Sequence, residues 1–522
     1  MNHHGNSCDV VVIGAGFGGL GTAMALAERG AKVTLLESLK YPGGCASTFE
    51  HRTKELGTLR FEAGATLFSG FGEGQLFRRW IDRYGLEVEV DWLDPVVELR
   101  TPSFTLPVPA RRGLLIERLA ALPGAPERRK VEAFFRYQQR VADALWGVLD
   151  DPSLLPPFGA GALLRHALRV PAYAPLLRIV GQPLTKVLDR FGVGGPGSLR
   201  SYLDALCQIT VQCGVEEAEA PFALATMDYH FRGTGHVRGG IGRLAWGLVD
   251  GIRRLGGEVR FTERVKGLER DGDAWRVLTR RGEFRAGAVV ANVLPQALKA
   301  LLKDPSPGIP ALDDLARQVE GGWGACMLYR AVRAGADDHP HHLELIQDEG
   351  APFEEGNHLF CSSSGPADGD RAPQGLRTLT VSTHVPMATL RGLSKDERGP
   401  YVAGIQERMR RGLRRLAPEL DAATELERTA SPRTFERFTG RPHGYVGGVP
   451  RRAGTANYRQ LIPAPVLPGL HLVGDTVFPG QSTLATALGG VKLAARLHGR
   501  GHADAAPRRR DDGAGLEIPI PS

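Results

Sequence analysis

The chain has 522 residues, 42% of them hydrophobic, and carries a formal net charge of +7. Such a length can bury more than one hydrophobic core, so we expect two domains. No apolar run reaches the roughly 18 residues needed for a membrane-spanning helix, and the first residues lack the shape of a signal peptide. The positive charge permits attraction to acidic surfaces, but the sequence has no basic stripe interleaved with aromatic residues, so we do not expect a nucleic-acid partner.

The six cysteines show neither CxxC spacing nor the framework of a disulfide-bonded secreted protein. They are Cys8, Cys45, Cys207, Cys213, Cys326 and Cys361. We therefore expect reduced thiols and a cytoplasmic location, and the sequence predicts no metal site.

The first predicted element is a strand over residues 9–13, a β-branched run typical of central parallel strands. In the glycine-rich turn that follows, Gly14 permits the tight turn and Gly16 lets the backbone approach a pyrophosphate. Gly19 lets a helix pack close to the strand. That helix would present free N–H groups and its positive end to phosphates. The candidate cofactor residues of this turn are Gly14, Ala15, Gly16, Gly18 and Gly19.

A second strand over residues 32–36 leads to Glu37, at the position of a carboxylate that binds the ribose of a dinucleotide. Strand, glycine turn, helix, strand and acid in this order predict a Rossmann-like nucleotide site rather than a plain glycine-rich turn. The pattern by itself does not distinguish NAD from FAD.

Two further glycine-bearing loops follow, at Pro42–Cys45 and Phe61–Thr66. With them the chain resembles the FAD-dependent amine-oxidase and phytoene-desaturase superfamily, most closely its carotenoid desaturase, carotenoid isomerase and retinol saturase branch. Many members carry arginine where this chain has Cys45, so a cation that could face the pyrophosphate is missing. We favour a small packed residue at Cys45 over a reactive thiol. The resemblance implies FAD contacts for Gly43, Gly44, Cys45, Gly64, Ala65 and Thr66.

Residues 152–188 contain no acidic residue, and Arg165, Arg169 and Arg178 are mixed there with leucines and aromatic residues. Two interpretations stay open. Such a surface can lie in a membrane interface and meet anionic lipids, or it can form a lid over a substrate cavity. We assign helices with one of these two roles to residues 152–191.

A predicted helix from Gly240 to about residue 255 is followed by a strand and by Val265. This order resembles the return of a flavoprotein chain to its FAD domain, where the backbone at the position of Val265 meets the adenine; a plain strand residue is the alternative. A strand over residues 288–291 ends at Asn292. Residues 322–440 have the composition of a second domain with a mixed or antiparallel sheet.

The C-terminal motif is the most discriminating. A strand over residues 471–473 meets the Gly-Asp pair at 474–475, and a Phe-Pro-Gly-Gln run precedes a long apolar helix. This motif resembles the corresponding motif of carotenoid isomerases and late-acting carotenoid desaturases. In that family the Asp binds the ribityl or phosphate side of FAD, and the helix points its positive end at the flavin ring. The implied contacts are Gly474, Asp475, Gln481, Ser482 and Thr483.

The expected fold class is α/β: a Rossmann-like FAD-binding domain of amine-oxidase type with an inserted α+β substrate domain that carries a mixed sheet. The cofactor domain would comprise residues 1–100, 235–300 and 435–500. The substrate domain would comprise residues 101–234 and 301–434, and residues 501–522 are predicted to be disordered.

The resemblance implies hydride exchange between FAD and a long apolar isoprenoid, with carotenoid desaturation as the leading hypothesis. Redox-neutral cis–trans isomerisation by reduced FAD and oxidation of another substrate stay open. A non-catalytic isoprenoid carrier is disfavoured because the glycines, Glu37 and Asp475 are all present. The sequence identifies neither the electron acceptor nor a catalytic acid or base. For His230 and Arg232, a structural role is favoured over a catalytic one.

Overall fold

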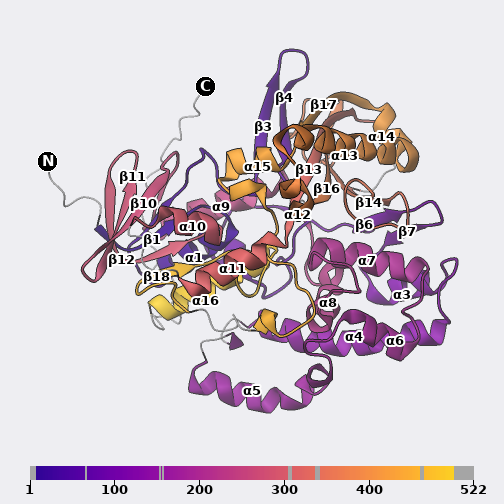
Figure 1. Ribbon diagram of the computed structural model, residues 1–522, viewed down its shortest axis with the longest axis horizontal. Helices are drawn as coiled ribbons and strands as arrows, with labels where there is room; N and C mark the ends of the chain where they lie inside the picture. The colour runs from indigo at the N-terminus through magenta and orange to yellow at the C-terminus, as the bar shows by residue number, and fades with distance from the viewer. Residues whose placement is uncertain are drawn as a thin grey trace.

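The computed structural model describes residues 7–64, 67–151, 154–155, 158–303, 309–335, 341–458 and 464–498. Two seven-stranded sheets organise them, with helices packed around each (Figure 1). Ala65, Thr66 and the predicted disordered tail lie outside the described residues. Among the described helices, none combines the length and the apolar character needed to cross a membrane.

The first sheet is built from three distant parts of the chain. Its strands are β1 (Ser7–Ile13), β2 (Val33–Leu36), β9 (Glu258–Arg260), β10 (Val265–Asp271), β11 (Ala274–Thr279), β12 (Glu283–Ala291) and β18 (Leu470–Leu472). Their order is β10-β11-β12-β1-β2-β9, and β18 pairs with β12. β1 is parallel to both of its neighbours, so its β-branched run occupies the centre of the sheet, as predicted.

Helices α1 (Phe17–Ala27) and α16 (Thr483–Leu497) pack side by side and bring the two ends of the chain together. Every residue of α1 is buried. A Cβ on Gly21 would lie 2.7 Å from Ala487 Cα, and one on Gly490 would lie 2.6 Å from the Gly18 carbonyl oxygen. Glycine on both helices therefore permits their close approach. A third helix, α9 (Ile241–Arg254), also contacts α1.

The second sheet has the order β17-β13-β16-β15-β14-β6-β7. Its strands are β6 (Val97–Arg100), β7 (Thr105–Val108), β13 (Trp323–Arg333), β14 (His342–Ile346), β15 (His358–Ser363), β16 (Leu376–Pro386) and β17 (Thr424–Ala430). Its neighbours are antiparallel except for β14 and β6, which are parallel, so the sheet is mixed, as predicted. Because β6 belongs to it, this sheet begins before residue 101.

Helices cover both faces of the second sheet (Figure 1). On one side lie α3 (Arg112–Ala120), α4 (Arg128–Leu149), α6 (Leu184–Phe191), α7 (Ser198–Thr210) and α8 (Ala220–Thr226). On the other lie α12 (Met387–Gly392), α13 (Lys395–Leu416) and α14 (Pro418–Ala422). The remaining elements are α2 (Leu76–Tyr84), α10 (Pro295–Leu301), α11 (Pro310–Glu320), α15 (Pro432–Thr439), the hairpin β3 (Thr48–Thr53) and β4 (Gly57–Glu62), and the pair β5 (Val90–Asp91) and β8 (His236–Val237).

Helix α5 (Ala160–Tyr173) lies at the periphery of the molecule (Figure 1). Ala162 is its one fully buried residue. Most of the exposed large hydrophobic side chains of the described chain lie on this helix and the turns beside it: Phe158, Leu163, Leu164, Leu168, Val170, Leu177 and Val180. The part of the acid-free segment around α5 is therefore an exposed apolar surface, whereas Leu154, Leu155 and Leu184 of the same segment are buried.

Candidate functional site

The glycine-rich turn after β1 has the geometry that its sequence predicts. Gly14 adopts a φ of +93°, a conformation that favours glycine. A Cβ on Gly19 would lie 2.0 Å from the Gly14 carbonyl oxygen, so only glycine lets α1 begin this close to β1. A Cβ on Gly18 would lie 3.1 Å from Gly474 Cα. The two glycine motifs therefore meet at the N-terminus of α1, where a helix attracts anions.

Glu37 lies at the end of β2, and backbone groups hold its carboxylate. Oε2 accepts from the Ala15 N–H at 2.7 Å, and Oε1 accepts from the Leu39 N–H at 2.8 Å. Beside it, the Glu263 N–H donates to the Glu37 carbonyl at 2.8 Å. The Oε1 atom of Glu263 is buried and has no partner among the described residues. Because an orphaned buried acceptor is costly, this end of the site fits a ligand that brings hydroxyl or amino donors.

Asn292, directly after β12, joins the two glycine motifs. In the orientation that satisfies its neighbours, its amide oxygen accepts from the N–H groups of Gly16 and Gly19 at 3.2 and 3.3 Å. A Cβ on Gly474 would lie 2.7 Å from the same amide. Asn292 thus satisfies two of the N–H groups that the first turn of α1 leaves without helical partners.

The glycine pair Gly43–Gly44 packs against the glycine-rich turn that follows β1. Gly43 and Gly44 adopt φ values of +111° and +62°, and the Gly43 N–H donates to the Ala15 carbonyl at 2.8 Å. Burial raises the pKa of the Cys45 thiol, so the thiol stays protonated at neutral pH. This fits the packed residue that we favoured over a reactive one. A Cβ on Gly64 would lie 2.9 Å from the Cys45 carbonyl oxygen, which makes this loop equally compact.

Asp475 forms a largely buried ion pair at the end of β18. Its Oδ2 atom accepts from Arg441 Nη2 at 2.7 Å. Burial opposes the charged guanidinium, but the Asp475 carboxylate outweighs it and raises the pKa of Arg441. The charge of Arg441 also acts on the thiol of Cys45. Arg441 therefore places a guanidinium near the position where many superfamily members carry arginine.

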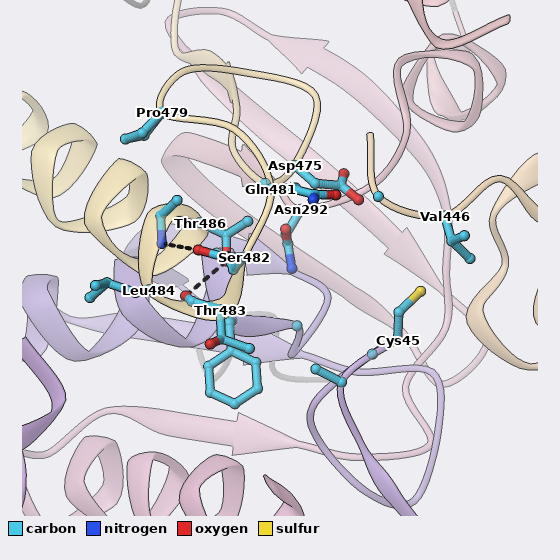
Figure 2. Close-up of a pocket in the computed structure, with 18 of the residues that line it drawn as sticks. Cys45, Asn292, Val446, Asp475, Pro479, Gln481, Ser482, Thr483, Leu484 and Thr486 are labelled. Carbon is cyan, nitrogen blue, oxygen red and sulfur yellow. Dashed lines mark hydrogen bonds between the residues drawn. The ribbon is translucent and has the colours of Figure 1, made fainter. Parts of the chain in front are cut away.

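The N-terminus of α16 opens toward Asp475 and Asn292, as Figure 2 shows. Ser482 caps the helix: its Oγ accepts from the Ala485 N–H at 3.0 Å (Figure 2). Gln481 ties this turn to the end of α7, because its Nε2 donates to the carbonyls of Ile209 and Thr210, each at 2.8 Å. The side-chain amide of Gln481 thus donates to backbone carbonyls of the protein, whereas the first turn of α16 faces the site.

A single cavity of about 960 Å³ joins these parts, at the upper end of the range for ligand pockets. The predicted residues that line it are Gly14, Gly16, Gly18, Glu37, Gly43, Gly44, Cys45, Gly64, Val265, Gly474, Asp475, Gln481, Ser482 and Thr483. Ala15 and Gly19 do not line it but shape the turn behind it. The predicted cofactor residues that the structure describes therefore lie in or directly behind the wall of one cavity.

The other half of the cavity is apolar. Its wall comes from α4, α7, α8, the turns before α5, and the second sheet. The lining side chains include Leu145, Trp146, Leu149, Leu154, Leu155, Phe158, Ile209, Phe222, Met327 and Phe360. Such a wall binds a ligand through buried apolar area rather than through charge.

His230 and Arg232 do not line the cavity. The ring nitrogens of His230 are buried without partners among the described residues, and burial lowers its pKa to about 4. Arg232 pairs with Asp143 and, at 3.2 Å, with Asp228. These positions fit the structural role that the sequence favoured.

From the sequence, no role could be assigned to four polar residues of the site: Asn292, Glu263, Arg441 and Arg451. Arg451 is, after Arg441, the second buried cation there. Its Nη2 donates to the Pro479 carbonyl at 3.2 Å, and its guanidinium lies 5.3 Å from the centre of the Phe222 ring. Burial lowers the pKa of Arg451 to about 10, so it remains charged at neutral pH. An arginine in an irregular loop has no local pattern that marks it.

Comparisons with known proteins agree with this geometry. Residues 12–84 match the NAD(P)-binding Rossmann-like domain family. The chain is 26% identical to the chloroplastic prolycopene isomerase of Arabidopsis thaliana, over 94% of this chain and 82% of that protein. It is 24% identical to the hydroxyneurosporene desaturase of Rubrivivax gelatinosus, over 96% and 95% of the two chains. It is also 24% identical to human all-trans-retinol 13,14-reductase, over 90% and 82%.

Among solved structures, putrescine oxidase bound to putrescine superposes with a TM-score of 0.61 at 15% identity, over 94% of this chain and 99% of that one. The amine-oxidase fold predicted from the motifs is therefore confirmed, as is the Rossmann-like nucleotide-binding part. Over nearly its whole length the chain is thus similar to a carotenoid isomerase and a carotenoid desaturase, as the motifs predicted, and it is an enzyme.

Proposed function

We propose that this cavity binds FAD, extended from Glu37 to the first turn of α16. Three features support this proposal: the cradle formed by the glycine turns at 14–19, 43–44 and 474, the orphaned oxygen of Glu263, and the N-termini of α1 and α16. So does the similarity to carotenoid isomerases and desaturases along nearly the whole chain. A bound flavin supplies the capacity to accept or donate a hydride.

Each part of the cradle has a role in this proposal. Glu37, Glu263 and Val265 hold the adenosine, and the turn at 14–19 holds the diphosphate with α1. The loop at 43–45 and the Gly474–Asp475 pair flank the middle of the cofactor, and the start of α16 faces the ring. By the same proposal, the parts of the chain that build the first sheet form the cofactor domain, and those that build the second form the substrate domain.

The substrate that we propose is a long apolar isoprenoid of the carotenoid type, and the reaction is its desaturation. The observation that carries this proposal is the continuity of the cavity from the nucleotide cradle to an apolar wall. A hydrocarbon chain offers no charge to grip, so its binding depends on such a wall. An amine substrate would instead need a polar or anionic group in that half.

Product analysis tests this proposal. Purified protein should contain FAD or take it up on addition. Acyclic carotenoids incubated with the oxidised protein should then give products with longer chromophores, separated by chromatography. A protein that neither contains nor binds FAD would refute the cofactor. A flavoprotein that alters no polyene but oxidises an amine would refute the substrate class.

Isomerisation is the second candidate, because the prolycopene isomerases align with nearly the whole chain. It predicts a different requirement: the isomer profile of a carotenoid would change only with pre-reduced protein, and no net oxidation would occur. The same panel, run with oxidised and with pre-reduced protein, distinguishes the two reactions.

We further propose that the protein is cytoplasmic and meets the membrane through α5, near the mouth of the apolar half. Phe158 and His166 line the cavity, while the neighbouring Leu164 and Leu168 are exposed. Arg178, also exposed, adds positive charge that anionic lipids attract. A lipophilic substrate could then pass from bilayer to cavity without crossing water.

Replacing Leu164 and Leu168 together by Asp should abolish this contact. Burial of a leucine side chain contributes roughly 1.5–3 kcal/mol, so the double variant should bind anionic liposomes at least about 100-fold more weakly. Flotation measures the effect, and Trp92→Asp, an exposed apolar residue elsewhere in the chain, is the control. If the double variant floats as well as the unaltered protein, α5 is a lid rather than a membrane contact.

A further inference from the structure

Desaturation requires a group that takes a proton from the isoprenoid, and the sequence named none. Away from the glycine turns, the cavity wall offers few side chains that can exchange a proton. Glu263 lies at the proposed adenosine end, and the lining arginines Arg264, Arg441 and Arg451 already carry their protons. Among the described residues this leaves His166, Tyr229, His384 and Tyr458.

Three of the four are already engaged by the protein. The ring nitrogens of His166 contact a tyrosine hydroxyl at 2.9 Å and a backbone carbonyl at 2.8 Å. The Tyr229 hydroxyl donates to a backbone carbonyl, and the Tyr458 hydroxyl donates to the Glu219 carboxylate at 2.5 Å. Within the described chain, the imidazole of His384 makes no such hydrogen bond, so its lone pair remains for a ligand.

His384 lies on β16 and lines the cavity. Its ring packs edge-to-face on Trp323, with ring centres 5.5 Å apart. The Trp323 indole N–H donates to the Gln212 carbonyl at 2.8 Å, and the Gln212 amide packs against Gly447. The next residue, Gly448, lies directly against the Asp475 carbonyl. A short series of contacts therefore connects His384 to the Asp475 end of the cradle.

We propose that His384 is the catalytic proton acceptor of this cavity, a role that rests on the proposed desaturation. One allylic carbon of the isoprenoid loses a hydride, with its electron pair, to the bound oxidised flavin. The adjacent carbon loses a proton to a ring nitrogen of His384. The electrons of that second C–H bond form the new C=C bond, and the imidazolium later returns its proton to water.

The surroundings of His384 keep it in the basic form. Burial lowers its pKa to about 3, and the neighbouring His358 of β15 acts in the same direction. On β13, Ala325 lies opposite it and adds no charge. The Glu355 N–H donates to the His384 carbonyl, while the Glu355 carboxylate is held by Arg408 at 3.0 Å. A weak base is sufficient, because departure of the hydride makes the adjacent C–H bond strongly acidic.

The test compares His384→Gln with the unaltered holoprotein in anaerobic single turnovers with an acyclic carotenoid. We expect flavin reduction to slow by about 10²- to 10⁴-fold, the usual contribution of a positioned base. The unaltered protein should show a constant rate between about pH 5 and 8, because a base of pKa about 3 stays deprotonated there. Flavin content and the carotenoid-induced absorption shift, which report binding rather than turnover, should change by less than about threefold.

His342→Gln is the matched control, since His342 is a buried histidine of the same sheet that does not line the cavity. Its rate should stay near that of the unaltered protein, and His384→Asn should repeat the loss seen in His384→Gln. Fast reduction in either His384 variant, or loss of flavin or carotenoid binding in both, would overturn the role of His384 alone. Absence of reduction in the unaltered protein with every carotenoid would overturn desaturation as well.

Discussion

Gly19→Ala is expected to yield protein that does not retain its cofactor. The added Cβ would lie 2.0 Å from the Gly14 carbonyl oxygen, and that neighbour is backbone, which cannot rotate away. Either α1 moves off β1 or the turn opens, and both displace the N–H groups that we propose for the diphosphate. We expect overpacking to cost about 1–3 kcal/mol of stability and FAD affinity to fall at least about 100-fold. Thermal unfolding and a fluorescence titration with FAD measure the two effects.

Gly113→Ala is the matched control for this substitution. Gly113 also lies in a helix, but a Cβ there would meet nothing within 4 Å. Since alanine is the better helix former, the control should be as stable as the unaltered protein or more stable by roughly 0.5–1 kcal/mol. Full FAD binding by Gly19→Ala would contradict the assignment of this turn to the cofactor.

Asp475→Asn should cost more stability than an ordinary removal of an ion pair. The Asp475 side chain is 19% exposed and that of Arg441 15%, so the substitution leaves a guanidinium charge largely buried without its partner. Breaking a buried pair in this way costs about 3–5 kcal/mol, and we expect the lower end here because water reaches both groups. Urea unfolding measures the loss, and we expect FAD affinity to fall with it.

Asp82→Asn provides the comparison, because Asp82 pairs with Arg78 at 2.8 Å, nearly the distance of the Asp475–Arg441 pair. Both members of this pair are about half exposed, so the pair contributes only about 0.3–0.5 kcal/mol. If the two variants lose equal stability, burial is not what gives the Asp475 pair its importance.

The glycine-rich loops around the proposed cofactor could be predicted because the backbone conformation there requires glycine, and glycines at fixed spacing are visible in the sequence. The turn at 14–19, the pair at 43–44 and Gly474 all permit a positive φ or a close approach, and no other residue type serves as well. Central strand β1 was predictable for a similar reason, since a β-branched run fits a strand that is covered on both faces.

The other polar groups of the site could not be predicted in the same way. Asn292, Glu263, Arg441 and Arg451 act through neighbours that come from distant parts of the chain, so no spacing marks them. His384 lies in a strand whose alternation does not distinguish a cavity wall from a core. The composition of residues 152–188 indicated an apolar and basic surface, but only the exposure of α5 shows that the rest of the protein leaves it uncovered.

Anaerobic mixing of the FAD-loaded protein with an acyclic carotenoid tests the central claim most directly. Both chromophores are followed in one stopped-flow trace. We expect the oxidised flavin band to bleach at the same rate at which the carotenoid absorption moves to longer wavelength, because one hydride transfer causes both changes. A flavin that remains oxidised while every carotenoid of the panel keeps its spectrum would contradict hydride transfer from an isoprenoid to this cavity.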